Sequence, residues 1–108
     1  MSFTINIYYK GKNGSAKKFA NEMISSGLVE EIRSKKGNLR YEYFEPLEDK
    51  ETILLIDSWL DQDSLNRHHE SETMNKIIEL RNKYDLHMKV EKYILENNNN
   101  QDEKYIRK

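Results

Sequence analysis

The sequence predicts an α+β domain built on an antiparallel four-stranded sheet, and three observations lead to this prediction. First, the 108 residues fit one domain, because folded domains usually contain about 100 to 150 residues. Second, four segments have the composition or the alternation of strands. Third, the segments between them repeat apolar residues at the spacing of a helix face. The chain order is therefore strand, helix pair, strand, strand, helix pair, strand.

The first strand is expected at residues 3–9, where apolar and aromatic side chains alternate with more polar ones. Ser15 can then accept a hydrogen bond from the free amides of a helix that begins at Ala16. The sequence Ser-Ser-Gly at 25–27 should break this helix into two parts. Gly37 suits the left-handed residue that follows a helix end.

The second and third strands are expected at 39–44 and 53–59, paired as a hairpin. Asp61 or Asp63 can cap the helix after this hairpin, and Ser71 can cap its continuation.

The last strand covers about 87–95. Residues 96–108 have no apolar period, so we expect a flexible polar C-terminal tail after a single domain at 1–95.

This order of elements is the ferredoxin-like split β-α-β arrangement, in which the helices cover one face of the sheet. The strands are largely apolar on both sides of the pleat, as Leu54 beside Leu55 illustrates. The face without helices would expose a large apolar patch on a monomer. We therefore expect a homodimer that joins two sheets face to face, a dimeric α+β barrel.

The composition excludes several classes of function. A net charge of -1 and a pI near 6.3 give no positive field for nucleic acid. The absence of cysteine excludes disulfides, thiolate catalysis and sulfur-ligated zinc. No stretch approaches the roughly 18 apolar residues of a membrane span, and no signal-like segment opens the chain. We expect a cytoplasmic protein without membrane or nucleic-acid partners.

Two blocks of sequence, GNLRYEYF at 37–44 and LLIDSWLDQDSLNRHHES at 54–71, resemble the antibiotic biosynthesis monooxygenase (ABM) family. The resemblance is carried by Gly37, Arg40, Tyr41, Asp57, Trp59 and His68. It implies a homodimeric α+β barrel with a pocket between sheet and helices. The activities it implies include cofactor-independent oxidation of quinols and phenols, haem degradation and the processing of signal molecules, and some members have no known reaction.

His68 and Trp59 are the expected catalytic residues. The resemblance places His68 over the pocket, where a histidine can accept a phenolic proton near neutral pH. Trp59 either walls the pocket and stacks on a planar substrate or fills the core. His69 lies about 100° further round the helix, so we expect it to face solvent. Because position 73 is threonine, the HExxH zinc pattern is incomplete, and no metal site is expected.

Tyr41, Asn6 and Asn38 are candidates for hydrogen bonds to a substrate oxygen. Asp57 could be a functional carboxylate, because burial raises the pKa of an acid. The plainer interpretation is a cross-strand ion pair between Asp57 and Arg40.

The favoured function is a monooxygenase that oxidises a small quinol or phenol with dioxygen and needs no cofactor. A base such as His68 would remove a proton, the anion would reduce dioxygen, and a peroxide would collapse to quinone and water. One alternative is a dimer that binds a small molecule or regulates a partner without catalysis. Haem degradation is disfavoured because the iron-binding histidine would fall near Ile78.

Overall fold

The computed structural model describes residues 2–94 and 100–108. Its elements are β1 (Phe3–Lys10), α1 (Ser15–Ser25), α2 (Leu28–Arg33), β2 (Asn38–Phe44), β3 (Thr52–Trp59), α3 (Gln62–His69), α4 (Glu72–Lys83), β4 (His87–Ile94) and α5 (Asn100–Glu103). The α+β class and the chain order are thereby confirmed. The predicted boundary at residue 96 lies outside the described residues, and the flexibility of the tail stays a prediction.

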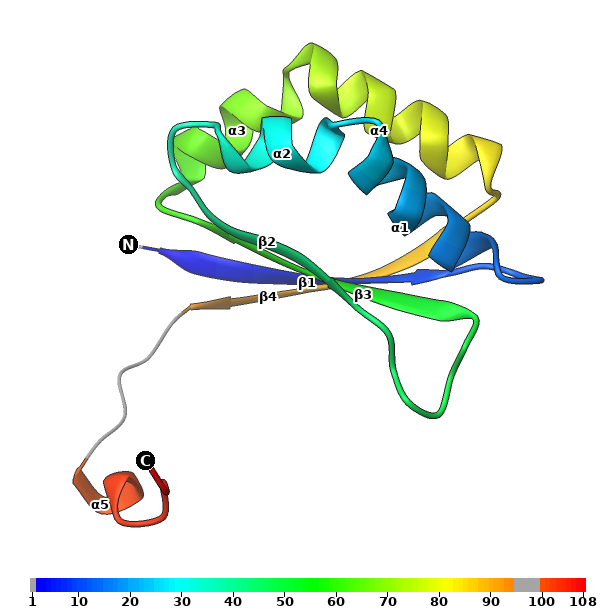
Figure 1. Ribbon diagram of the computed structural model, residues 1–108. Helices are drawn as coiled ribbons and strands as arrows, with labels where there is room; N and C mark the ends of the chain where they lie inside the picture. Colours follow the sequence, from blue (N-terminus) through cyan, green and yellow to red (C-terminus); the bar gives the residue numbers. More distant parts are fainter. Residues whose placement is uncertain (1, 95–99) are drawn as a thin grey trace.

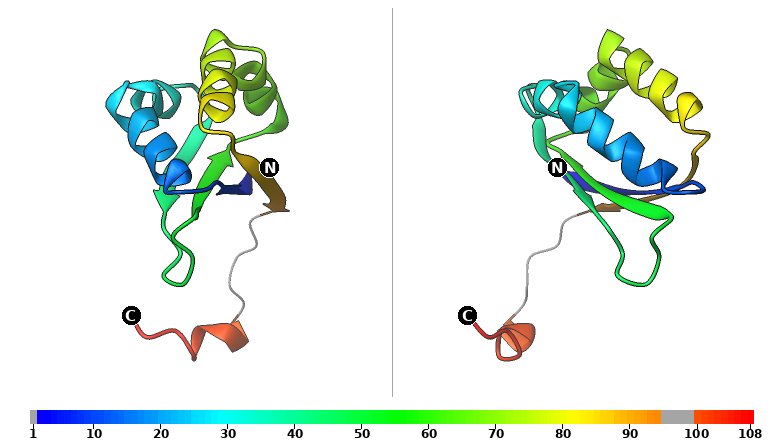
Figure 2. Two further views of the ribbon diagram at one scale, coloured as in Figure 1. Left: turned by 90° about the vertical axis from the view of Figure 1, so that its right-hand side faces the viewer. Right: turned by 45° about the vertical axis from the view of Figure 1, so that its right-hand side comes forward.

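The four strands form one antiparallel sheet in the order β2-β3-β1-β4. Helices α1 to α4 lie on one face of this sheet, and no helix of the described residues packs on its other face (Figures 1 and 2). Opposite residues of paired strands point to the same face. Ile5 pairs with Asp57 on β3 and with Lys92 on β4, which fixes the register across the centre.

The helix-covered face holds the core. Its buried apolar and aromatic strand residues are Phe3, Ile5, Tyr9, Tyr41, Ile53, Leu55 and Trp59. All of them except Ile53 pack in one cluster with Phe19 and Met23 of α1 and Ile32 of α2. Ile53 packs against Ala16 and Ala20 of α1. β4 stays exposed along nearly its whole length, so the covered face opens to solvent at this edge.

The turn before α1 differs from the prediction. Gly14 takes the cap position in a left-handed conformation, with φ 78°, and gives no side-chain cap. Ser15 is already helical, and its hydroxyl accepts from the Lys12 amide at 3.0 Å. The Glu51 carboxylate accepts from the amides of Asn13 and Gly14 instead. A side chain 37 residues away therefore satisfies these amides, which local sequence patterns do not reveal.

The other breaks and caps agree with the sequence. Gly27 separates α1 from α2 with φ 86°. Asp61 and Ser71 accept from the amides of Ser64 and Met74 at the starts of α3 and α4. Gly37 is left-handed as expected, and it also lies against α3: a Cβ there would stand 2.1 Å from the Ser64 hydroxyl.

The face without helices, called the open face below, is mixed in character. Tyr8, Leu54 and Ile56 are half-buried at its centre, and Phe44 and Tyr93 are exposed on the two edge strands. No helix of the described residues is long and apolar enough to cross a membrane.

Candidate functional site

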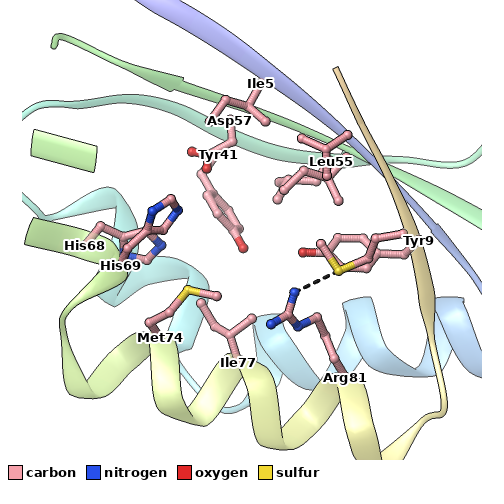
Figure 3. A pocket seen from close by; sticks show the side chains of 13 residues that line it. Ile5, Tyr9, Tyr41, Leu55, Asp57, His68, His69, Met74, Ile77 and Arg81 are labelled. Carbon is pink, nitrogen blue, oxygen red and sulfur yellow. Dashed lines mark hydrogen bonds between the residues drawn. The ribbon is translucent and has the colours of Figure 1, made fainter. Parts of the chain in front are cut away.

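A pocket of about 220 Å³ lies between the sheet and helices α3 and α4. Its wall is mostly apolar, and Figure 3 shows its polar side chains grouped at different places. His68 and His69 lie at one end, Tyr9 and Arg81 lie at the other, and Asp57 and Tyr41 lie between them. The apolar lining residues are Ile5, Ile7, Leu55, Met74, Ile77, Met88 and Val90.

His68 is held on two sides. Its ring stacks on the fully buried indole of Trp59, with the centroids 5.0 Å apart and the planes at 24°. Its Nδ1 lies 2.9 Å from the Nζ of Lys35, which also donates to the Ser71 hydroxyl at 2.8 Å. Burial lowers the pKa of His68 to about 4, and the charges of Lys35 and His69 act in the same direction.

These contacts define the protonation state of His68. An ammonium group only donates, so Nδ1 must be the acceptor and the proton of the neutral ring must reside on Nε2. The low pKa keeps the ring neutral at pH 7. The side chain can therefore offer an N–H to a ligand oxygen, but it is a poor proton acceptor.

The pKa of Asp57 is shifted in the opposite direction to that of His68. Burial raises its pKa to about 6, while the indole of Trp59 and the amide of Asn38 act to lower it. Asn38 Nδ2 donates to a carboxylate oxygen at 3.3 Å. The indole N–H of Trp59 is directed toward Asp57 but has no hydrogen bond of good geometry within the described chain. Asp57 is thus a buried acid that changes charge close to neutral pH.

The predicted ion pair between Arg40 and Asp57 is wrong. The β2–β3 register shifts between Asn38 and Arg40, so Tyr41 stands opposite Asp57 and Arg40 stands opposite Ser58. Arg40 consequently lies on the open face, where its Nε donates to Glu42 at 2.8 Å.

The structure brings together only some of the predicted site residues. Tyr41 and His68 line the pocket, whereas Trp59 lies behind His68 and Asn38 reaches Asp57 from the side. Asn6 does not join them, because it pairs with Ile56 and its side chain lies on the open face. His69 is exposed as expected, yet it also lines the pocket, with its ring centroid 5.9 Å from that of His68.

Three residues with polar roles in the site were missed from the sequence. Tyr9 belongs to the same alternating set as Ile5 and could have been found by strand parity. Arg81 follows Ile77 by four residues, the spacing that puts both on one helix face. Lys35 lies in the turn after α2, and no local pattern relates it to a histidine 33 residues later.

Tyr9 and Tyr41 bring hydroxyl groups into the pocket. Burial raises the pKa of each, so both are protonated near neutral pH and can donate hydrogen bonds. The Tyr41 hydroxyl lies 3.2 Å from that of Tyr43. No group of three or more metal-ligating side chains occurs in the described ranges. The groups available for chemistry are thus one acid, the neutral imidazole of His68, the exposed imidazole of His69, two phenols and one guanidinium.

Comparison with known proteins agrees with this architecture. The family model for antibiotic biosynthesis monooxygenase matches residues 2–80. The curated "Putative monooxygenase YcnE" of Bacillus subtilis (strain 168) is 27% identical over 67 residues, which are 62% of this chain and 68% of that protein.

Two solved structures illustrate the shared fold. A protein from Deinococcus radiodurans has a TM-score of 0.76 at 15% identity, covering 93% of this chain and 97% of its own. SnoaB of Streptomyces nogalater, a cofactor-independent oxygenase, has a TM-score of 0.74 at 9% identity, covering 90% and 95%. The match over residues 2–80 confirms the resemblance seen in the sequence. The chain belongs to the antibiotic biosynthesis monooxygenase family.

Proposed function

We propose that this protein is a monooxygenase that oxidises a small quinol or phenol with dioxygen, without a bound cofactor. One observation carries the proposal: the same small apolar pocket holds a carboxyl group with a pKa of about 6 and a neutral histidine. Together they can take a proton from a phenolic hydroxyl and stabilise the anion that results. The relation to SnoaB, a cofactor-independent oxygenase, supports this class of reaction.

The roles of Asp57 and His68 differ from the expectation drawn from the sequence, in which His68 is the base. Asp57 is the proton acceptor, because its carboxylate is the stronger base of the two groups near neutral pH. His68 donates its Nε2 proton in a hydrogen bond to the phenolate oxygen. Lys35 is a positioning residue, since its bond to Nδ1 keeps the proton on Nε2.

The reaction then balances without another reductant. The phenolate gives one electron to dioxygen, the two radicals combine to form a carbon–oxygen bond, and the hydroperoxide loses water. One oxygen atom of dioxygen becomes a new carbonyl group and the other leaves as water. The proton held by Asp57 returns to the departing oxygen, so the carboxylate is regenerated.

The size and polarity of the pocket limit the range of possible substrates. Its volume of about 220 Å³ is below the roughly 300 Å³ at which pockets for drug-sized ligands begin. A substrate with one ring is therefore favoured over a polycyclic one. The apolar walls exclude water from the anion and from the peroxide, which protects both from side reactions.

The proposal includes a homodimer in the cytoplasm. Leu54, Ile56 and Tyr8 form an apolar centre on the open face, which no helix of the described residues covers. A second copy placed on this face would remove that centre from water at both subunits. The absence of cysteine is compatible with a reducing compartment.

Oxygen uptake tests the function. The purified protein is mixed with a panel of one-ring and two-ring quinols in the presence of a chelator, and uptake is followed with an electrode. We expect one-ring quinols to be oxidised, with uptake reduced at least about 100-fold in Asp57→Asn and about 10-fold in His68→Gln. Glu42→Asn, a carboxylate lost from the open face, is the matched control and should retain full activity.

Two outcomes would contradict the proposal. Saturable binding of these quinols without oxygen consumption would indicate a binding or regulatory protein instead. Uptake that survives in Asp57→Asn and His68→Gln would place the chemistry outside this pocket.

A further inference from the structure

Arg81 is a charged side chain in an apolar part of the pocket. It reaches in from α4, and Figure 3 shows its guanidinium at the end opposite the two histidines. Its Nη1 donates to the sulfur of Met88 at 2.8 Å, and a thioether is only a weak acceptor. Within 2–94 and 100–108, Arg81 forms no ion pair. A half-buried cation is therefore left without a counter-charge.

The other edge of this guanidinium is available for a ligand. Nε and Nη2 have no hydrogen-bond partner in the part of the chain that the structure describes. Two parallel N–H groups match the two oxygens of a carboxylate, and this bidentate pairing is the strongest that arginine makes. The neighbouring lining groups, Tyr9 and Ile77, carry no charge that would repel an anion.

We propose that the pocket is built for a small aromatic acid, whose carboxylate pairs with Arg81 while its ring hydroxyl lies between Asp57 and His68. The two ends of the pocket then recognise two different groups of one ligand. The position of the hydroxyl rests on the proposed function, whereas the carboxylate site rests on Arg81 alone. A one-ring ligand is required, because both groups must fit within about 220 Å³.

Binding of two matched probes tests this inference without relying on turnover. The probes are hydroquinone and 2,5-dihydroxybenzoate, which differ by one carboxylate, and titration under nitrogen is followed by NMR and calorimetry. We expect the wild-type protein to bind 2,5-dihydroxybenzoate about 10-fold to 100-fold more tightly than hydroquinone. Arg81→Met should abolish this preference, because it weakens the binding of 2,5-dihydroxybenzoate far more than that of hydroquinone.

Two further variants keep the test decisive. Arg81→Lys retains the charge without the planar pair of donors, so it should keep only part of the preference. Lys76→Met removes a cation from an exposed position of the same helix and should change nothing. Thermal unfolding of each variant verifies that it is folded.

Equal affinity of the wild-type protein for the two probes would overturn the inference, as would failure of 2,5-dihydroxybenzoate to bind. A preference that survives in Arg81→Met would overturn it as well. Selective binding combined with no oxygen uptake would sustain the carboxylate site and refute the oxygenase proposal. Failure of the carboxylate site and failure of the proposed oxygenase function are thus distinguishable.

Discussion

The two faces of the sheet are built from the same four strands, yet they differ in what they can do. On the covered face, burial changes the pKa values of Asp57, Tyr9 and Tyr41 and the helices complete a pocket. On the open face, Arg40 and Glu42 form an exposed ion pair beside apolar residues. Neighbouring residues of one strand therefore belong to different environments. Substituting one or the other should affect different properties of the protein.

Leu54 and Leu55 give the sharpest contrast, because they are adjacent on β3 and point to opposite faces. Leu55 is 1% exposed, and Leu55→Ala should lower the free energy of unfolding by about 2 to 5 kcal/mol. Leu54→Asp should instead leave the fold intact and shift the protein from dimer to monomer. Urea unfolding and light scattering over a range of concentrations measure the two effects. A monomeric wild-type protein, or equal losses of stability in both variants, would remove the contrast.

The pH dependence of stability separates the two ionisable groups of the covered face. The pKa of Asp57 rises from 3.8 to about 6 on folding, so the folded state retains a proton that the unfolded state has released. The contribution of Asp57 to stability therefore falls as pH rises between about 4 and 6. The pKa of His68 falls from 6.5 to about 4, so its contribution to stability rises between about 4 and 6.5. The two slopes oppose each other in the wild-type protein.

Removing either Asp57 or His68 should reveal the pH dependence of stability that the other residue contributes. Asp57→Asn should become more stable with rising pH over this window, and His68→Gln should become less stable. Each slope amounts to roughly 2 to 3 kcal/mol across the window. Urea unfolding at several pH values measures it. If both variants kept the profile of the wild-type protein, neither group would titrate as described.

Lys35 affects His68 by a smaller amount. Lys35→Met removes the donor at Nδ1 and a nearby positive charge, so the pKa of His68 should rise while burial still keeps it below 6.5. The proton can then occupy either nitrogen, and oxygen uptake should fall about 10-fold. Nitrogen NMR of the imidazole detects both changes, and the exposed neighbour Lys36 provides the control as Lys36→Met. A single Nε2–H tautomer in Lys35→Met would contradict this role.

The smallest effect concerns the absent pair of Arg40 and Asp57. Because these residues lie on opposite faces, Arg40→Ala and Asp57→Asn should be additive within about 0.5 kcal/mol in a double-mutant cycle. The Arg40 and Glu42 pair should also contribute less than about 1 kcal/mol, since both side chains are exposed. A coupling of more than about 1 kcal/mol between Arg40 and Asp57 would require a different register.

Local signals in the sequence were enough for the elements of the fold. The strand bounds were predicted to within one residue, and the caps at Ser71 and at Asp61, one of two candidates, were also found, because all of these depend on neighbouring residues. Register is not local: the irregularity between Asn38 and Arg40 moved Arg40 away from Asp57. Strands with large residues on both sides also hide which face is covered, which is why Asn6 was assigned to the site.

The candidate site was predictable only in part for the same reason. His68, Tyr41 and Asp57 could be named from the sequence because they lie in the block that resembles the family. The contact from Lys35 to His68 joins the turn after α2 to α3 through space. Burial, with a smaller contribution from the Lys35 charge, lowers the pKa of His68 and makes it a poor base. Protonation chemistry depends on such contacts, so it could not be read from residue types.

The dependence of kcat/KM for oxygen uptake on pH tests the central claim most directly, using a one-ring quinol and the wild-type protein. If Asp57 is the proton acceptor, the rate should rise with pH to a plateau with a midpoint near 6, because the carboxyl group must be ionised to accept a proton. Asp57→Asn should lose most of the activity and show no transition near pH 6, whereas Glu42→Gln should retain both the activity and the transition. A midpoint near 6 that persists in Asp57→Asn would contradict the assignment of this residue as the base.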